Sequence, residues 1–383
     1  MGKITAVDLF CGAGGFSLAA LNSDVTLLAA VELDADACAT YKKNIIEQRS
    51  CKTKLFNEDI LKVDIESFSS SLSLNDGNLD LLIGGPPCQG FSSHRINDQG
   101  VDDPRNELLI RYFDFVKKLM PDAFIVENVP GLLWERHKSY LDRFKAISED
   151  SGYKILGPVK LNAKDYGVPQ NRNRVFILGV KNSLDIDETL WPPKPTHFQS
   201  SLSSPIWRNA SEVFEQPNES ELNEIENILG KNVVKELKFG SELPLSADDS
   251  SAIHMNHTTD LTKRFELTPI NGSRGDIDFR LPCHSDGYVG HKDVYGRIRL
   301  AQPGPTITTG CFNPSKGRFL HPWKNHGITI RHAARLQTFP DDFTFTGGIT
   351  NQGKQVGNAV PVKMGEVIIK TVIQMVKGKT YTK

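Results

Sequence analysis

Residues 4–16 read ITAVDLFCGAGGF, an apolar run that contains an acidic residue and leads into a glycine-rich turn. A short apolar run bounded by glycines is typical of a buried strand. Glycines after a strand let the backbone approach a cofactor closely and let the next helix begin. The segment therefore predicts a strand, a turn and a helix that suit a nucleotide-type cofactor.

The alternation of short apolar runs with helical patterns continues outward to about residue 180. The predicted strands are Ile4–Leu9, Val25–Glu32, Leu79–Gly84, Ala123–Glu127 and Arg174–Val180. The predicted helices are Phe16–Leu21, Ala35–Asn44, Glu107–Leu119 and Tyr140–Glu149. This pattern indicates an α/β fold with helices around a parallel sheet, and ligands of such sheets bind outside the carboxyl ends of the strands. Glu32, at one strand end, could accept hydrogen bonds from a ribose, and Asp59-Ile60, after a further short run, could hold an adenine.

Residues 82–92 read LIGGPPCQGFS, so a predicted strand runs into two glycines and two prolines before Cys88. A lone cysteine is often only a small buried apolar residue. Here polar Gln89 and Ser92 lie close to it in the sequence, just past the carboxyl end of the strand. Because a thiolate is a strong nucleophile, this setting favours catalysis over packing for Cys88.

A carboxylate and two arginines are candidate partners for this cysteine. Glu127 ends a strand in DAFIVENVP at residues 122–130, and burial is expected to raise its pKa and make it a proton donor or hydrogen-bonding group. Capping of the next turn is its alternative role. Residues 170–174 read QNRNR, and strand alternation places Gln170, Arg172 and Arg174 on one side. The arginines are expected to face an anionic or polar partner, with a surface salt bridge as the alternative.

The pattern changes near residue 181. WPPKP at residues 191–195 and SSLSS at residues 200–204 are typical of a domain boundary. Few helical periods follow, and residues 304–310 are expected to form a short strand, before helical patterns resume at Arg331–Gln337 and Val362–Val376. The chain is therefore expected to form one domain from residues 1–180 and 328–383 and a smaller, irregular domain from residues 181–327.

Composition narrows the class of protein. The 383 residues are 39% hydrophobic and 24% charged, which is ordinary for a globular protein, and no apolar stretch is long enough to span a bilayer. No secretory signal is recognised. The six cysteines, at positions 11, 38, 51, 88, 283 and 311, show neither a disulfide framework nor zinc spacing. We therefore expect a cytoplasmic protein without a bound metal.

Eight motifs follow one another in the order of a known family. They are DLFCGAGGF at 8–16, Glu32, Asp59-Ile60, PPCQ at 86–89, ENV at 127–129, QNRNR at 170–174, RHAARLQTFP at 331–340 and QVGNAVP at 355–361. In this order they resemble the bacterial DNA (cytosine-5) methyltransferases of restriction–modification systems. The resemblance covers nearly the whole chain and fades between Val180 and Ile328.

The resemblance implies a Rossmann-like S-adenosylmethionine-dependent methyltransferase domain and a second, smaller, irregular target-recognition domain. It implies that the chain moves a methyl group from S-adenosylmethionine to C5 of a cytosine. Cys88 would attack C6 of a flipped-out base, Glu127 would act at N3, and Arg172 and Arg174 would lie by the base and the thiolate. The implied donor-binding residues are Asp8, Phe10, Gly12, Gly14, Gly15, Glu32, Asp59, Ile60, Pro87, Leu108, Asn358 and Val360. Residues 91–106 would form a loop that closes over the site.

The implied partner is double-stranded DNA with a specific target sequence. A cognate restriction endonuclease acting on the same site, a bacterial or phage origin and a monomeric state are also expected. The net charge of −1 hides a basic stretch, since residues 254–331 carry eleven Lys or Arg against six Asp or Glu. The expected DNA contacts in this stretch are Arg274, Arg280, Lys292, Arg297, Arg299, Lys316 and Arg318.

Three alternatives stay open at this point. A transfer-RNA cytosine methyltransferase would keep every motif, but such proteins usually carry Cys-Phe-Thr in the second domain, and here Cys311-Phe312 is followed by Asn313. A decayed relative that only binds its ligand would have no reason to keep Cys88 and Glu127 together. A nicotinamide-dependent oxidoreductase would explain the glycine turn and Glu32 but would leave Cys88 without a role.

Overall fold

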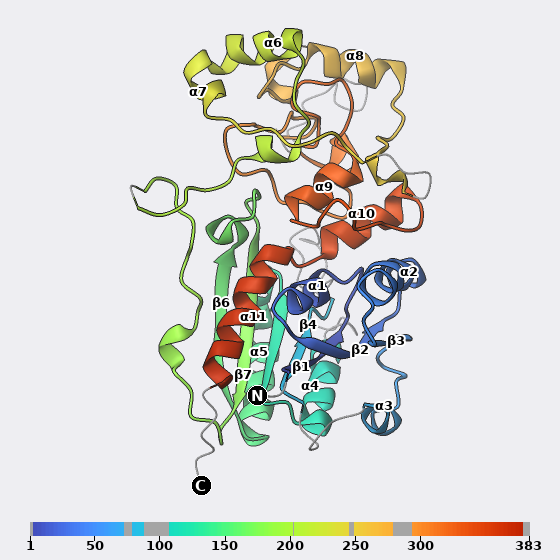
Figure 1. The fold of residues 1–383 in the computed structure, drawn as a ribbon, viewed down its shortest axis with the longest axis vertical. Coiled ribbons are helices and arrows are strands. Elements are labelled where there is room, and N and C mark those ends of the chain that lie inside the picture. Colours follow the sequence, from blue (N-terminus) through green and yellow to red (C-terminus); the bar gives the residue numbers. More distant parts are fainter. Residues whose placement is uncertain are drawn as a thin grey trace. The chain divides into compact units, whose positions relative to one another are not determined.

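The computed structural model describes residues 3–72, 79–87, 107–201, 203–244, 249–278 and 293–377. Cys88 and the expected closing loop lie outside these residues. By packing, the chain divides into two compact units (Figure 1). Unit 1 comprises Met1–Asn162, Asn173–Pro195 and Val360–Lys383, and unit 2 comprises Ala163–Arg172 and Thr196–Ala359.

The two units do not follow the expected division by residue number. Residues 328–359, which we expected in the catalytic domain, pack with residues 196–327. The physical reason is a set of buried polar contacts: Arg331 pairs with Asp249, and His332 bonds to Glu215. Packing does not define where a function resides, so the division into catalytic and target-recognition domains stays a prediction.

Unit 1 is built on one seven-stranded sheet. The strands are β1 (Thr5–Leu9), β2 (Thr26–Glu32), β3 (Lys54–Asn57), β4 (Leu81–Gly84), β5 (Ala123–Asn128), β6 (Tyr153–Asn162) and β7 (Asn173–Lys181). Their order across the sheet is β3-β2-β1-β4-β5-β7-β6. The first five strands in this order are parallel, as predicted, whereas β7 runs antiparallel to both β5 and β6. The sheet is therefore mixed, and β3 and β6 add to the five predicted strands.

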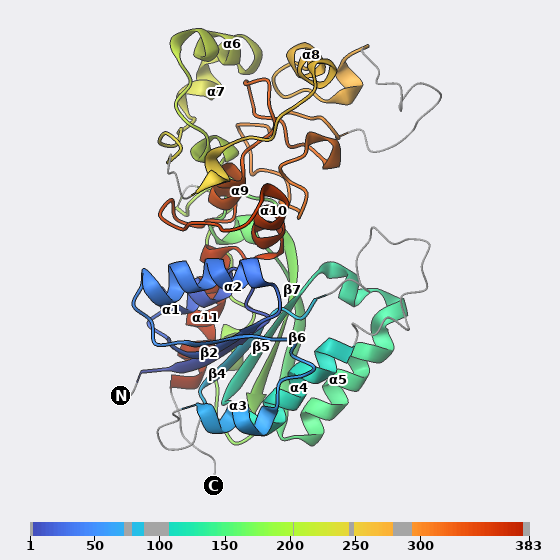
Figure 2. The same ribbon diagram turned by 90° about the vertical axis from the view of Figure 1, so that its right-hand side faces the viewer.

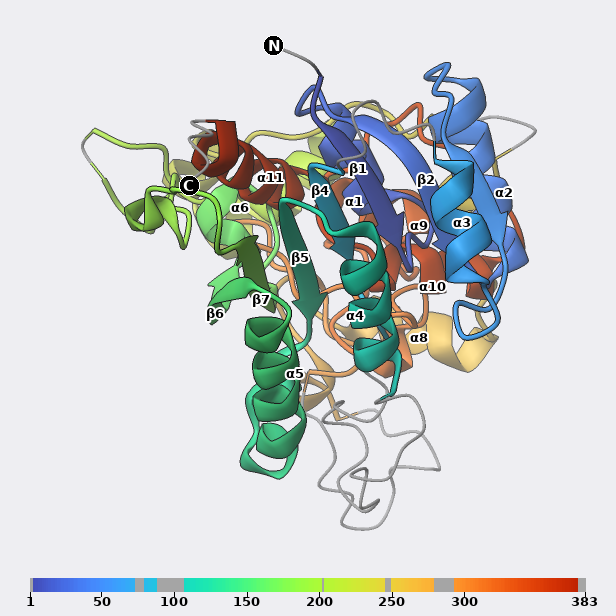
Figure 3. The same cartoon turned by 90° about the horizontal axis from the view of Figure 1, so that it is seen from below.

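Helices cover both faces of this sheet. They are α1 (Gly15–Leu21), α2 (Ala35–Tyr41), α3 (Ile65–Ser71), α4 (Glu107–Leu119), α5 (Lys138–Asp150) and α11 (Val362–Lys377). α11 packs against α1, so the last helix folds back onto the first, and Gly365 allows close approach to Ala19. On the other face α3, α4 and α5 pack in sequence (Figures 2 and 3). The core of unit 1 includes the buried aromatic residues Phe68, Phe113 and Phe124. The Rossmann-like α/β fold is confirmed, and its strand order reverses between β1 and β4, where such folds bind ligands.

Unit 2 has little regular structure. Its helices are α6 (Glu219–Leu229), α7 (Lys231–Lys235), α8 (Thr259–Leu267), α9 (Ile330–Leu336) and α10 (Ile349–Asn358). The strand expected at residues 304–310 is wrong, because that segment forms only a single bridge at Gly304. Side chains take the place of a neighbouring strand there: Gln170 accepts from the Ile307 amide, and Arg172 donates to the Ile307 carbonyl.

Buried arginines replace ladder hydrogen bonds elsewhere in unit 2. Arg172 and Arg331 are fully buried, and Arg297 is nearly so. Arg297 donates to the carbonyls of Phe265, Thr268, His321 and Lys324. Buried main-chain carbonyls need a donor, and a guanidinium supplies five N–H groups in a fixed geometry. Within the parts of the chain that the structure describes, no helix is long and apolar enough to cross a membrane.

Candidate active site

The glycine turn after β1 has the backbone that its sequence predicts. Phe10, Gly12 and Gly14 all have positive φ, at 61°, 54° and 98°. The Gly12 amide donates to Glu32 Oε2 at 2.9 Å, so the turn is tied to the end of β2. A Cβ built on Gly12 would meet nothing within 4 Å, whereas one on Gly14 would lie 3.0 Å from the Tyr41 ring. Gly12 therefore borders open space, and Gly14 is needed for packing.

Glu32 is the acidic group at the edge of this turn. Its other oxygen accepts from the amides of Leu33 and Asp34, and burial raises its pKa. Leu33 is 65% exposed directly beside it. A hydrogen-bonding carboxylate beside an exposed apolar side chain suits a ligand with a hydroxylated part and a flat apolar part. The sequence pattern did not indicate Leu33, and its position directly after an acidic strand end was the available signal.

Asp8 lies beneath the turn. Its carboxyl accepts from Ser17 Oγ at 2.6 Å, and Ser17 in turn lies 2.9 Å from the Tyr41 hydroxyl. Burial raises the pKa of Asp8 to about 7. The buried Asp8 carboxyl is thus hydrogen-bonded to Ser17 in the first turn of α1, and this bond helps to fix the glycine turn between β1 and α1. Gly15, the first residue of α1, is also buried.

The segment after β3 is held by α4. Asp59 is half-buried and accepts from the Leu61 amide, while Ile60 is buried. Arg111 of α4 donates to the carbonyls of Ile60 and Val63. Leu108, one turn earlier on α4, packs against the core of unit 1. Arg111 is a positioning group that sequence reasoning missed, since only the fold brings α4 beside this segment.

The ends of β4 and β5 meet where the nucleophile is expected. The two strands are parallel, with Gly84 opposite Val126. A Cβ on Gly85 would lie 3.1 Å from Glu127 Oε2, and the Asn128 side chain donates to the Pro86 carbonyl at 3.3 Å. Pro87 is exposed, and Cys88 follows it outside the described residues. The segment that leads to Cys88 is therefore held next to Glu127 by packing and by the hydrogen bond from Asn128.

Glu127 forms a nearly buried ion pair. Arg174 Nε lies 2.8 Å from Glu127 Oε1, and the two side chains are 12% and 10% exposed. Arg174 reaches it from β7, the antiparallel neighbour of β5. The ion pair holds the Glu127 side chain against the neighbouring antiparallel strand. Such a group can accept a hydrogen bond when ionised or donate one when protonated.

The two arginines of QNRNR belong to different compact units. Arg174 of unit 1 binds Glu127, whereas Arg172 of unit 2 is fully buried and donates to three main-chain carbonyls. Asn358, the last residue of α10, is exposed in unit 2. Val360 begins the last segment of unit 1 and is buried.

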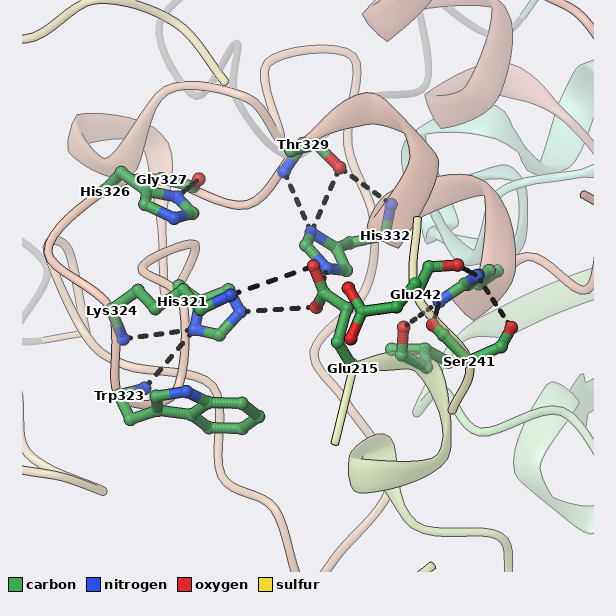
Figure 4. Close-up of polar contacts among 12 residues, drawn as sticks. Glu215, Ser241, Glu242, His321, Trp323, Lys324, His326, Gly327, Thr329 and His332 are labelled. Atoms are coloured by element: carbon green, nitrogen blue, oxygen red, sulfur yellow. Dashed lines mark hydrogen bonds and ion pairs between the residues drawn. The ribbon is translucent and has the colours of Figure 1, made fainter. Parts of the chain in front are cut away.

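A second polar cluster lies in unit 2 (Figure 4). Glu215, His321 and His332 bring their ligand-type atoms within 4.8 Å of one another, and all three are buried. His332 Nε2 lies 2.9 Å from Glu215 Oε2, and His321 Nε2 lies 3.7 Å from the same oxygen. Burial opposes the charge of Glu215, but the two histidines outweigh it and lower the pKa of the Glu215 carboxyl. Burial lowers the pKa of both histidines.

The ring tautomers indicate what this cluster does. His321 Nδ1 accepts from the amides of Trp323 and Lys324, and His332 Nδ1 accepts from the Thr329 amide. Each Nδ1 lone pair is thus in use, so a neutral ring carries its hydrogen on Nε2, facing Glu215. A metal ligand would need that Nε2 lone pair. The geometry therefore fits a hydrogen-bonded cluster that ties Glu215 to α9 better than it fits a cation site.

The basic residues expected to contact DNA differ in their burial, and Arg274 is half-buried. Arg297 is wrong as a phosphate contact, because it is buried and its guanidinium binds carbonyls of unit 2. Arg318 pairs with Asp293 and donates to three carbonyls, so it is also part of the framework. Arg299 and Lys316 are exposed. Arg280 and Lys292 lie outside the described residues.

Comparisons with known proteins bear on this arrangement. A family model described as C-5 cytosine-specific DNA methylase matches residues 4–374. The chain is 31% identical to the Type II methyltransferase M1.HphI of Haemophilus parahaemolyticus, over 97% of this chain and 87% of that protein. It is 30% identical to the Type II methyltransferase M.DdeI of Desulfomicrobium norvegicum, over 96% of this chain and 88% of that protein.

Two solved structures share the fold. One is a protein from an Escherichia coli prophage described as a DNA modification methyltransferase, with a TM-score of 0.69, 24% identity, and coverage of 98% of this chain and all of that chain. The other is the Schizosaccharomyces pombe Dnmt2 methyltransferase, with a TM-score of 0.59, 13% identity, and coverage of 97% and 99%. At these identities the likeness concerns the fold alone.

Proposed function

The chain belongs to the C-5 cytosine-specific DNA methylase family, and on that premise we propose that it is the modification enzyme of a type II restriction–modification system. It would methylate C5 of one cytosine in a specific double-stranded sequence. The observation that carries the proposal is the position of the Gly85–Pro87 segment, which leads to Cys88. Gly85 lies against Glu127 of the Glu127–Arg174 pair, and the Pro86 carbonyl accepts a hydrogen bond from Asn128. This arrangement supports a nucleophile and an acid or hydrogen-bonding group acting on one base.

The residues after β1 and β2 fit S-adenosylmethionine as the methyl donor. Gly12 borders open space where a ligand can approach the backbone, and the Glu32 carboxylate can accept from ribose hydroxyls. Leu33, Asp59 and Ile60 could hold the adenine. Bound there, S-adenosylmethionine supplies an electrophilic methyl group. We retain Pro87, Leu108 and Asn358 as further donor contacts, on the strength of the family motifs.

The chemistry needs a covalent step because cytosine C5 is a poor nucleophile in an aromatic ring. The Cys88 thiolate would add to C6, and the electron pair displaced toward N3 would be stabilised by Glu127. C5 then has enamine character and can accept the methyl group. Loss of the C5 proton to a base and expulsion of the thiolate from C6 restore the ring and free the enzyme.

Access to C6 requires that the cytosine leave the stacked duplex. An enzyme acting on a base atom inside a duplex must flip the nucleotide out, at a cost of about a few kcal/mol. We propose that residues 181–327 read the target sequence. A cognate endonuclease, a monomeric state and a cytoplasmic location stay predictions. A transfer-RNA substrate is not favoured, since the matching family is one of DNA methylases.

A mechanism-based trap tests the proposal. Fluorine at C5 cannot leave as a cation, so DNA containing 5-fluorocytosine should hold wild-type protein in a covalent complex after methyl transfer. Cys88→Ser should form no complex and should transfer no labelled methyl group, while it binds S-adenosylmethionine about as tightly as wild type. Cys311→Ser is the matched control, because Cys311 is a buried cysteine of unit 2. An active Cys88→Ser enzyme, or no adduct with wild type, would refute the mechanism.

A further inference from the structure

Arg172 is fully buried in unit 2, and three main-chain carbonyls accept hydrogen bonds from its guanidinium. Nη1 donates to the Ile307 carbonyl at 2.7 Å. Nη2 donates to the carbonyls of Gly357 at 2.8 Å and Ala359 at 3.0 Å. These last two residues are the immediate neighbours of Asn358. One guanidinium thus holds the backbone on both sides of an exposed side chain.

Gln170 and Gln337 extend the same network. Gln170 Oε1 accepts from the Ile307 amide, and its Nε2 donates to Gln337 Oε1 at 2.8 Å. Gln337 Nε2 then donates to the carbonyls of Val356 and Ala359. The end of α10 is therefore held by two side chains, Arg172 and Gln337, and Gln170 in turn holds Gln337.

The backbone at this point has no room to shift toward its neighbour. A Cβ on Gly357 would lie 2.4 Å from the Thr308 carbonyl carbon and 2.4 Å from the Thr309 amide nitrogen. The backbone of Gly357 therefore packs directly against the backbone of Thr308 and Thr309, and its carbonyl accepts a hydrogen bond from Arg172. Loss of the guanidinium would leave buried carbonyls without that donor and would loosen the residues around Asn358.

We propose that Arg172 is a positioning residue for Asn358, so that it serves binding of the methyl donor, while Arg174 acts on the base side through Glu127. The proposal rests on the proposed function, in which Asn358 contacts S-adenosylmethionine. A side chain that fixes its neighbour by packing and hydrogen bonds supports a binding site without touching the ligand.

Two assays separate the donor side from the base side. Calorimetry with S-adenosylmethionine measures donor affinity. Exchange of tritium from C5 of cytosine into water, without donor, measures the base side: the thiolate adds to C6, C5 takes a solvent proton, and loss of the tritium then expels the thiolate. The substrate is unmodified bacterial DNA labelled with 5-tritiated deoxycytidine. This exchange needs Cys88 and Glu127 but no donor.

Arg172→Lys keeps the charge but cannot span the carbonyls on both sides of Asn358 with one planar group. We expect its Kd for the donor to rise about tenfold or more, with tritium exchange within about twofold of wild type. Arg174→Lys is the matched control and should show the reverse, with slow exchange and unchanged donor affinity. Asn358→Ala should weaken donor binding, and adding Arg172→Lys to it should weaken binding no further, because both act on one contact.

The outcomes are distinct. Slow exchange in Arg172→Lys with unchanged donor affinity would overturn the proposal and place Arg172 by the base. Additive losses of donor affinity in the double variant would also overturn it, since Arg172 would then act apart from Asn358. Thermal unfolding of each variant shows whether the protein is folded when assayed. Failure of the wild type to bind S-adenosylmethionine at all would instead refute the proposed function.

Discussion

Replacement of Gly12 by alanine, compared with the same change at Gly152, tests whether the open space beside Gly12 is used by the methyl donor. The comparison accounts for the cost of placing an L-residue at a positive φ, because both glycines have one. Gly12 has φ 54° with no atom within 4 Å of a built Cβ, and Gly152, between α5 and β6, has φ 84° with the same open surroundings. An L-residue in left-handed backbone costs about 1–2 kcal/mol. Gly12→Ala and Gly152→Ala should therefore lose similar amounts of stability, and urea unfolding measures that loss.

Donor binding should distinguish the two variants. The methyl group added in Gly12→Ala would enter the space where we expect the ligand to meet the backbone next to Glu32. We expect Gly12→Ala to bind S-adenosylmethionine at least about tenfold more weakly, equivalent to about 1.4 kcal/mol, and Gly152→Ala to bind it as wild type does. Calorimetry on folded protein decides the point. Equal affinities in the two variants would show that the donor does not approach Gly12.

Two further predictions concern acid stability and sequence recognition. Burial lowers the pKa of His326 to about 4 in the folded protein. As the pH falls, His326 therefore binds a proton in the unfolded chain at a higher pH than it does in the folded chain. The stability due to this neutral ring is complete above about pH 6.5 and is lost toward pH 4, which amounts to about 2 kcal/mol by pH 5. Urea unfolding at pH 7 and pH 5 should show most of this loss removed in His326→Gln, and an equal loss in both proteins would contradict it. A chimera that carries residues 181–327 of a relative of different specificity should methylate the relative's target in bisulfite sequencing, whereas methylation of the original site by an active chimera would place recognition elsewhere.

The local sequence was enough to predict β1, its glycine turn and α4 in unit 1. The apolar run at Thr5–Leu9 and the glycines after it predicted β1 and its turn, and the amphipathic pattern of Glu107–Leu119 predicted α4 with its observed bounds. Periodicity succeeds there because burial on one face and backbone conformation are properties of neighbouring residues. Glu127 was identified for the same reason, as an acidic group at the end of a buried strand.

Side-chain partners depended on the tertiary structure. Alternation placed Arg172 and Arg174 on one side, yet Arg174 pairs with Glu127 while Arg172 binds carbonyls of residues 307, 357 and 359. Arg297 was expected at the surface, and the fold buries it. The carbonyls that an irregular domain leaves without donors determine where a buried guanidinium binds. Residue spacing along the chain does not predict which carbonyls these are.

The sequence by itself determined the fold class, the family and the carboxyl ends of β1, β2 and β4, because each of these depends on short contiguous motifs. Only the tertiary structure decided that β7 lies antiparallel between β5 and β6, and so brings Arg174 to Glu127. It also joined Glu215 to His321 and His332, more than a hundred positions away along the chain. Such pairings form when distant segments bury their polar groups together, and the free energy of satisfying those groups belongs to the packed chain rather than to any segment of it.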